Sequence, residues 1–235
     1  MLAVTLERRA FRDFDQLVTL YTKERGKVTV LARGSKKSTS KNASLLEPLF
    51  LVEVDCADGK DMLHLTKVFP VESFGGLLES YEKMRVLGYV ASVVNTLVDE
   101  GESDDRIFTV YLNFLRELNG AKLVDTLVVA GFLVRLFEAL GSGLTVATCV
   151  RCGSSKTALF APYSGGMVCE ACSGALQAQN EPLVALNEAE KASLGYLVEG
   201  SLEEVRQAGF SPKISTALKH FFDRHSTKKI PDFPL

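Results

Sequence analysis

The sequence lacks several features on which common kinds of enzyme depend. Its 235 residues include no tryptophan and only three histidines, His64, His220 and His225. None of these histidines opens an H-x-E motif, whose glutamate would serve as the acid and base of a zinc-dependent nucleobase deaminase. The sequence also contains no G-x-S-x-G nucleophile motif and no G-x-x-x-x-G-K-[ST] phosphate-binding loop. A zinc deaminase, a covalent-nucleophile enzyme and a nucleotide hydrolase are therefore disfavoured.

The composition also lacks net charge and an uninterrupted apolar run. There are 27 Lys and Arg against 29 Asp and Glu. Hydrophobic residues make up 46% of the chain, which is enough to form the core of one large or two modest domains. The most apolar stretch, residues 123–140, contains Asp125, Arg135 and Glu138, which predicts a central buried helix and not a membrane span. The first residues, MLAVTLERRAFRDF, carry charges where a signal peptide would be apolar. We therefore expect a reduced, cytoplasmic chain with no membrane partner.

The charge that is present has an uneven distribution along the chain. Residues 1–41 contain ten basic and four acidic residues, whereas the remainder contains 17 basic and 25 acidic residues. A basic N-terminal part joined to an acidic remainder suggests that the first part has a polyanionic partner.

Four of the five cysteines form two C-x-x-C pairs, Cys149 with Cys152 and Cys169 with Cys172. The C-x2-C-x16-C-x2-C spacing is typical of a zinc site, because each pair can direct two thiolates at one cation. Four sulfur ligands leave no position for water or substrate, so we expect one structural Zn²⁺. Two disulfides, an iron centre and a redox-active pair are the alternatives. Cys56 lies in an apolar alternating stretch and is expected in a core.

The first third of the chain has the period of β-strands. Short alternating runs extend from Val4 to about Ser73, with turn signals at residues 25–26 and 57–59. They predict about five strands, and closing these strands into a small barrel would remove the exposed edges of an open sheet.

After this region the period becomes helical. Helix starts are expected at Asp104 or Asp105, at Asn187 with Glu190 in a capping box, and at Ser211 before Pro212. We therefore predict an α+β fold. It comprises a barrel domain at residues 1–78 and an α-helical domain at residues 79–235, with a zinc-binding insertion at about residues 145–178.

The richest basic stretch is RGSKKSTSK, residues 33–41, which we call the basic loop. Its Arg33, Lys36, Lys37 and Lys41 offer positive charge, while its glycine and serines let the backbone approach phosphate oxygens. None of these residue types reads a base by itself, so nucleic-acid binding would be largely independent of sequence and weakened by salt. A solvated surface loop is the alternative interpretation.

Aromatic side chains are scarce near the basic loop. Proteins that bind single strands usually stack bases on aromatic rings, but this loop contains none. Phe11, Phe14 and Tyr21 are the nearby aromatic residues, and we expect them mostly in the core. The pattern favours contacts with the phosphate backbone, which leave the bases free to pair.

Three parts of the sequence, taken in order, resemble the bacterial RecO family of recombination and repair proteins. They are YTKERGKVTVLARGSKKSTSKNASLLEPLFLVEV, a helical segment, and FEALGSGLTVATCVRCG…GGMVCEACS. The T-x-x-x-G and A-R-G-x-x-K-[ST] run between Thr22 and Thr39 and the cysteine pairs are the most specific parts. The resemblance implies an N-terminal OB-fold, a helical domain with a zinc-binding insertion, and a function without catalysis. It further implies binding of single- and double-stranded DNA and annealing of complementary strands. With RecR, and with or without RecF, such a protein helps to load RecA onto DNA coated by single-strand binding protein.

The resemblance also implies particular site residues. The zinc ligands would be Cys149, Cys152, Cys169 and Cys172. The DNA-binding residues would be Arg33, Lys36 and Lys37, with Lys41 and Arg12 as looser assignments. The family holds the acidic C-terminal tail of single-strand binding protein on its helical domain, and Arg135 lies near the corresponding motif. The alternative for Arg135 is an ion pair with Glu138 on a buried helix.

Two other interpretations stay open. A protein-binding adapter would use the basic part to dock acidic protein tails, with zinc supporting the fold. Alternatively, Arg151 and Lys156 beside the cysteines could present a lesser basic surface to nucleic acid.

Overall fold

The computed structural model describes residues 1–37, 39, 40 and 42–231, and for residues 202 and 203 the backbone alone. The chain forms two compact units. Met1–Val124, with Pro231, forms the barrel unit, and Asp125–Ile230 forms the cysteine unit. In the described ranges, no helix is both long enough and apolar enough to cross a bilayer.

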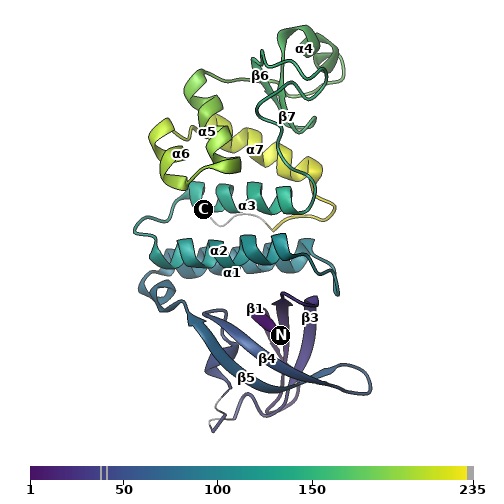
Figure 1. Cartoon of the computed structure of the whole chain (residues 1–235), viewed down its shortest axis with the longest axis vertical. Helices are drawn as coiled ribbons and strands as arrows, with labels where there is room; N and C mark the ends of the chain where they lie inside the picture. Colours follow the sequence, from purple (N-terminus) through teal and green to yellow (C-terminus); the bar gives the residue numbers. More distant parts are fainter. Residues whose placement is uncertain (38, 41, 232–235) are drawn as a thin grey trace. The chain divides into compact units, whose positions relative to one another are not determined.

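The barrel unit begins with a closed barrel of five strands (Figure 1). The strands are β1 (Leu2–Ala10), β2 (Gln16–Thr22), β3 (Gly26–Ala32), β4 (Phe50–Asp58) and β5 (Leu63–Ser73), with the 3-10 turn η1 (Ser44–Leu46) between β3 and β4. Their order around the barrel is β1-β2-β3-β5-β4; β3 and β5 pair in parallel and the other neighbours are antiparallel. Alternate residues such as Val18, Leu20 and Val30 fill the interior. The predicted barrel is confirmed, and Cys56 packs half-buried against this core.

The T-x-x-x-G motif forms the turn between β2 and β3. The Thr22 hydroxyl donates to the Gly26 carbonyl at 3.0 Å and accepts from the Arg25 backbone N–H at 3.0 Å. Gly26 has φ +63°, and a Cβ atom there would lie 1.9 Å from the carbonyl oxygen of Glu102. Only glycine fits this turn, because a side chain would meet both backbone strain and a direct clash.

Two helices complete the barrel unit. They are α1 (Tyr81–Leu97), which follows the 3-10 turn η2 (Gly75–Glu79), and α2 (Asp105–Gly120). Asp104 is the N-cap of α2, as expected, and its side chain accepts from the Arg106 N–H. Tyr21 of β2 is fully buried and stacks on Phe108 of α2 with 6.3 Å between ring centroids. The helices therefore cover part of the outer face of β2.

The cysteine unit is built around α3 (Thr126–Ala139), most of whose residues are buried, as the apolar stretch predicts. It packs against three later helices, α5 (Glu188–Glu199), α6 (Leu202–Ala208) and α7 (Pro212–His225). The expected capping box of Asn187 and Glu190 is present, and Ser211 caps α7 with Pro212 in its first turn. The short helix α6, with its own capping box from Ser201, escaped the sequence analysis.

The segment between α3 and α5 contains the cysteine pairs. It consists of β6 (Leu159–Ala161), β7 (Gly166–Val168), α4 (Glu170–Gln177) and β8 (Val184–Ala185), with strand order β7-β6-β8. The predicted fold class, a barrel followed by helices with an inserted four-cysteine segment, is confirmed. The division into domains at residues 78 and 79 stays a prediction, and α1 and α2 lie in the same compact unit as the barrel.

Candidate nucleic-acid interface and metal site

The four paired cysteines converge on one point. Cys149 and Cys152 lie in the turn before β6, Cys169 is the N-cap of α4 and Cys172 lies in its first turn. Their four Sγ atoms all lie within 4.8 Å of one another, and those of Cys152 and Cys169 are 3.7 Å apart. A tetrahedral zinc ion with Zn–S bonds of about 2.3 Å separates its sulfurs by about 3.8 Å. The cluster therefore fits a four-coordinate metal ion, and no disulfide joins any of the five cysteines, all of which are described.

Backbone contacts between β7 and the first cysteine turn bring the two pairs together. The Val150 N–H donates to the Met167 carbonyl of β7 at 2.9 Å, and within the turn the Cys149 N–H donates to the Ser154 carbonyl at 2.8 Å. A Cβ atom on Gly166 would lie 2.2 Å from the Thr145 carbonyl oxygen, so the chain passes closely here. Gly166 thus serves close approach of the backbone, which the weak periodicity of this segment could not show.

The pKa values of the clustered thiols differ. Burial raises the pKa of Cys149, but the backbone N–H groups of Cys169, Cys152 and Arg151 outweigh it and lower the pKa to about 6. Hydrogen bonds with the sulfurs of Cys169 and Cys152 raise the pKa of Cys172 to about 12. Four neighbouring thiolates repel one another, so a bound cation is what would allow all four to lose their protons.

The first residues of the basic loop, 33–37, are anchored where the chain leaves β3. Ser35 is buried, and its hydroxyl contacts the Ala32 carbonyl at 2.9 Å and the Gln16 side-chain oxygen at 3.1 Å. Gly34 adopts φ +64°, which turns the chain. Arg33, Lys36 and Lys37 are exposed on either side of the buried serine. Lys41 lies outside the described residues, and its role stays a prediction.

The β1–β2 turn, Phe11–Asp15, lies beside the basic loop. The Lys36 N–H donates to the Phe14 carbonyl at 3.0 Å, and the Gly34 N–H donates to the Asp15 carboxylate at 2.8 Å. Arg12 of this turn is exposed.

These two segments together present four exposed cations, which we call the cationic surface: Arg12, Arg33, Lys36 and Lys37. In the described part of the chain, none of the four forms an ion pair with a carboxylate. Asp13 is also exposed on the turn and reduces the positive charge there. Positive charge that is not held in an ion pair is available to an external anion.

An exposed aromatic ring lies within the cationic surface. The sequence did not predict this exposure. Phe14 is 55% exposed, although we expected it mostly in the core. The Lys37 ammonium lies 5.6 Å from its ring centroid, and the Arg12 guanidinium lies 5.1 Å from that of Phe11. The signal that could have found it is local: in F-R-D-F-D, two aspartates flank Phe14, which marks a turn beyond the end of the strand.

Arg135 lies elsewhere, on α3 of the cysteine unit. Its side chain is half-buried and donates to the Gly200 carbonyl at 2.8 Å, which ties α3 to the connection between α5 and α6. The contact with the tail of single-strand binding protein stays a prediction.

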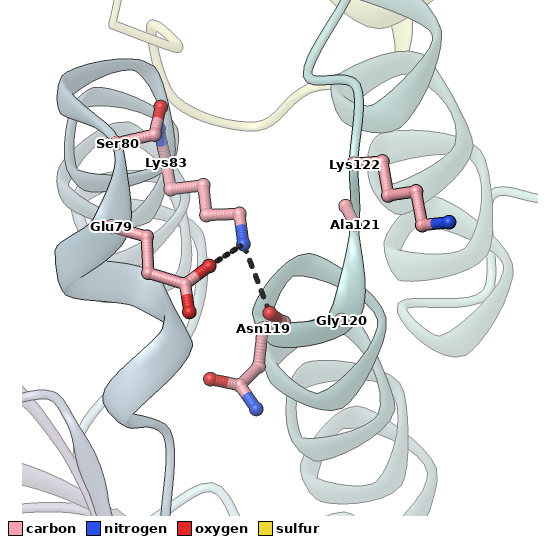
Figure 2. Close-up of a pocket in the computed structure, with 7 residues that line it drawn as sticks. All are labelled: Glu79, Ser80, Lys83, Asn119, Gly120, Ala121 and Lys122. Carbon is pink, nitrogen blue, oxygen red and sulfur yellow. Dashed lines mark hydrogen bonds and ion pairs between the residues drawn. The ribbon is translucent and has the colours of Figure 1, made fainter.

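A pocket of about 560 Å³ lies in the barrel unit, between the start of α1 and the end of α2 (Figure 2). Its Lys83 is 4% exposed, and Nζ contacts the carbonyl oxygens of Gly76 at 3.1 Å and Asn119 at 3.0 Å and the Glu79 carboxylate at 3.5 Å. Lys122 points away from this group (Figure 2). Because three acceptors surround the ammonium, Lys83 stabilises the end of α2. None of the site residues expected from sequence lines this pocket.

Together these features define a two-part class of protein, in which a small closed barrel precedes helices that carry a cluster of four cysteines able to hold a metal ion. The family models described as Recombination protein O N terminal and Recombination protein O C terminal match residues 2–74 and 78–232. The chain belongs to the RecO family of DNA repair and recombination proteins, so its barrel is an OB-fold.

Curated relatives are similar over most of the chain. The DNA repair protein RecO of Alkaliphilus metalliredigens (strain QYMF) is 22% identical over 215 residues, which are 91% of this chain and 86% of that protein. That of Roseiflexus sp. (strain RS-1) is 30% identical over 175 residues, 73% of this chain and 61% of that protein. That of Clostridium perfringens (strain 13 / Type A) is 25% identical over 218 residues, 92% and 86% of the two chains.

Proposed function

We propose that this protein is a DNA recombination and repair mediator that works without catalysis. It binds single- and double-stranded DNA through phosphate contacts at the cationic surface and anneals complementary strands. The observation that carries the proposal is the set of four exposed cations on two hydrogen-bonded segments, with no carboxylate paired to any of them among the described residues. Lysine and arginine side chains of this kind bind phosphate oxygens whatever the base sequence.

The packing within the barrel unit supports the loops, and not the strand faces, as the proposed binding surface. OB-folds commonly bind nucleic acid on the face of their second and third strands. Here Lys27 of β3 donates to the Asn95 carbonyl of α1 at 2.7 Å, and Tyr21 of β2 is buried against α2. The helices occupy part of the usual face, and the loops at the ends of the strands stay accessible.

Annealing follows from charge neutralisation. Two DNA strands repel each other through their phosphates, and cations that bind the backbones reduce this repulsion while the base edges stay free. Watson–Crick pairing then supplies the specificity. In the cell, the protein would act with RecR, and with or without RecF, to load RecA onto DNA coated by single-strand binding protein, whose acidic tail the helical part would hold.

The metal site supports the fold in this proposal. Four cysteine ligands fill the coordination shell of Zn²⁺ and leave no open position for catalysis. Bound zinc would stabilise the segment between α3 and α5, where Ala161, Val168 and Leu176 form a small buried cluster with Cys149 and Cys169.

The test is an annealing assay with complementary oligonucleotides, one of them coated by single-strand binding protein. Replacing both Arg33 and Lys37 with glutamate should slow annealing by about tenfold or more, because two attractive contacts become repulsive. The matched control is Arg151→Glu with Lys156→Glu, which changes net charge equally at exposed positions in the cysteine unit. Equal annealing rates for wild type and Arg33→Glu/Lys37→Glu would refute the proposed surface, and loss in the control alone would move it to the cysteines.

The same variant separates this proposal from a protein-binding adapter. A DNA-binding surface requires that Arg33→Glu/Lys37→Glu lose affinity for DNA. If DNA binding were unchanged while binding of an acidic peptide fell, the adapter function would be favoured.

A further inference from the structure

Phe14 is exposed in a way that the folding of the barrel does not require. It lies in the β1–β2 turn with 55% of its surface accessible, whereas the barrel core is filled by other apolar residues. Hydrophobic stabilisation depends on the apolar area removed from water, so a ring that stays exposed contributes little to the stability of the fold. A single exposed apolar side chain is ordinary on a protein surface, but a ring beside exposed cations is the arrangement with which proteins bind single strands.

The turn holds the ring in a defined place. The Phe11 N–H donates to the Asp15 carbonyl at 3.0 Å and closes the turn on itself. The carbonyl of Phe14 accepts from Lys36, and the carboxylate of Asp15 accepts from Gly34. These bonds fix the backbone that carries the ring, so less of the turn has to be ordered when a ligand binds.

The surroundings of the ring match the chemistry of a nucleotide. A single-stranded nucleic acid presents a flat base and an anionic phosphate within each repeat. Phe14 offers a flat apolar surface, and the ammonium of Lys37 lies 5.6 Å from its centroid, with Lys36 adjacent. Cationic grooves with interspersed aromatic rings are the general means by which proteins bind single strands without sequence preference.

We propose that Phe14 stacks on one unpaired base while Lys36 and Lys37 hold the neighbouring phosphates, so that the cationic surface binds single strands more tightly than duplex. This inference rests on the proposed function and adds a contact to bases that phosphate binding alone does not provide. In a duplex the bases are stacked on each other, and only the phosphate contacts remain. Stacking uses the face of a base and leaves its Watson–Crick edge free, so it is compatible with annealing.

The absence of tryptophan makes the contact directly measurable. A Phe14→Trp variant carries one tryptophan, and stacking on a base quenches indole fluorescence. Its titration with a single-stranded oligonucleotide should lower the emission by about half or more. An abasic oligonucleotide of the same length and charge should bind, as followed by the anisotropy of a dye on the oligonucleotide, without this quenching.

Two further variants provide the controls. Tyr163→Trp places the single tryptophan in the cysteine unit, at a ring that is 41% exposed and lies 5.9 Å from the Arg224 guanidinium. Its emission should not respond to the oligonucleotide. Phe14→Leu keeps an apolar side chain without a ring, and it should lower single-strand affinity about tenfold with little effect on duplex affinity.

The outcomes separate this inference from the function on which it rests. If Phe14→Trp binds the oligonucleotide with unchanged emission, or if Phe14→Leu keeps the wild-type preference for single strands, stacking is overturned and the phosphate-binding surface survives. Quenching of Tyr163→Trp equal to that of Phe14→Trp also contradicts the assignment. If the wild-type protein binds neither oligonucleotide, the proposed function and this inference fall together.

Discussion

The side chains of the cationic surface and of the cysteine cluster point in opposite directions, outward in the first and inward in the second. The cationic surface directs four like charges outward, and it is held in place by backbone hydrogen bonds such as Lys36 N–H to the Phe14 carbonyl. The cysteine cluster directs four sulfurs inward to one point, and two of them, Cys149 and Cys169, are buried. The first arrangement leaves positive charge accessible from outside, whereas the second gathers four sulfurs where one cation could bind them all. Binding to DNA and stability of the fold should therefore respond to different substitutions.

The largest expected effect concerns the metal site. Cys169→Ser with Cys172→Ser removes half of the ligands, and the lost metal-binding free energy is on the order of 10 kcal/mol in small zinc domains. We expect wild-type protein to contain one zinc per chain by elemental analysis and this variant to contain almost none. Limited proteolysis should then cut the variant between residues 141 and 186.

Cys56→Ser is the matched control for this change, because Cys56 lies in β4 and contributes no sulfur to the cluster. It should keep one zinc per chain. Folded wild-type protein that contains much less than one zinc per chain would contradict the metal assignment. A double serine variant that loses zinc but keeps DNA binding would sharpen the contrast between the two regions.

The next effect concerns the stability of the barrel unit. Gly26→Ala places a Cβ atom 1.9 Å from the Glu102 carbonyl oxygen at a positive φ, so unfolding free energy should fall by about 3 kcal/mol or more. Gly101→Ala, also at positive φ but with open space around it, should cost only about 1 kcal/mol. Chemical denaturation measures both, and equal losses would show that the close contact is unimportant.

A smaller effect concerns charge that serves stability in the cysteine unit. The ammonium of Lys213 and the backbone N–H of Asn187 lower the pKa of Glu190 below its usual 4.5. Since the folded pKa is lower than the unfolded one, the ionised carboxylate stabilises the fold above pH 4.5, and this contribution is lost as the pH falls through the folded value. Glu190→Gln should cost about 0.5–1 kcal/mol at neutral pH.

Denaturation at several pH values checks this prediction. The difference between wild type and Glu190→Gln should be constant near neutrality and shrink as the pH falls below about 4.5. Glu188→Gln is the control, because the Glu188 side chain is 90% exposed and its pair with Lys191 should contribute little. A difference that grows on acidification would contradict the assigned sign.

Local patterns predicted much of this structure, and what they missed lies in very short elements or depends on contacts between distant residues. The alternation through Val18 and Leu20 indicated the barrel, and the Asn187–Glu190 box indicated a helix start, because each depends on neighbouring residues. The strands β6 and β7 were missed because three residues are too few for a period.

The candidate site shows the same division. The four cysteines were found from their spacing, and the structure brings their sulfurs together. The cations of the basic loop were found as a charge run, and their binding role stays a proposal. The exposure of Phe14 was missed although its flanking aspartates indicate a turn, because the hydrogen bonds that hold this turn to the basic loop, some twenty residues away, cannot be read from the sequence.

The salt dependence of DNA binding tests the central claim most directly. If the cationic surface neutralises about four phosphates, log–log plots of association constant against salt should have a slope of about −3 to −4 on duplex DNA. Lys36→Ala with Lys37→Ala should reduce the steepness by about two. A double variant that keeps the wild-type slope and affinity would contradict the claim that this surface binds the phosphates.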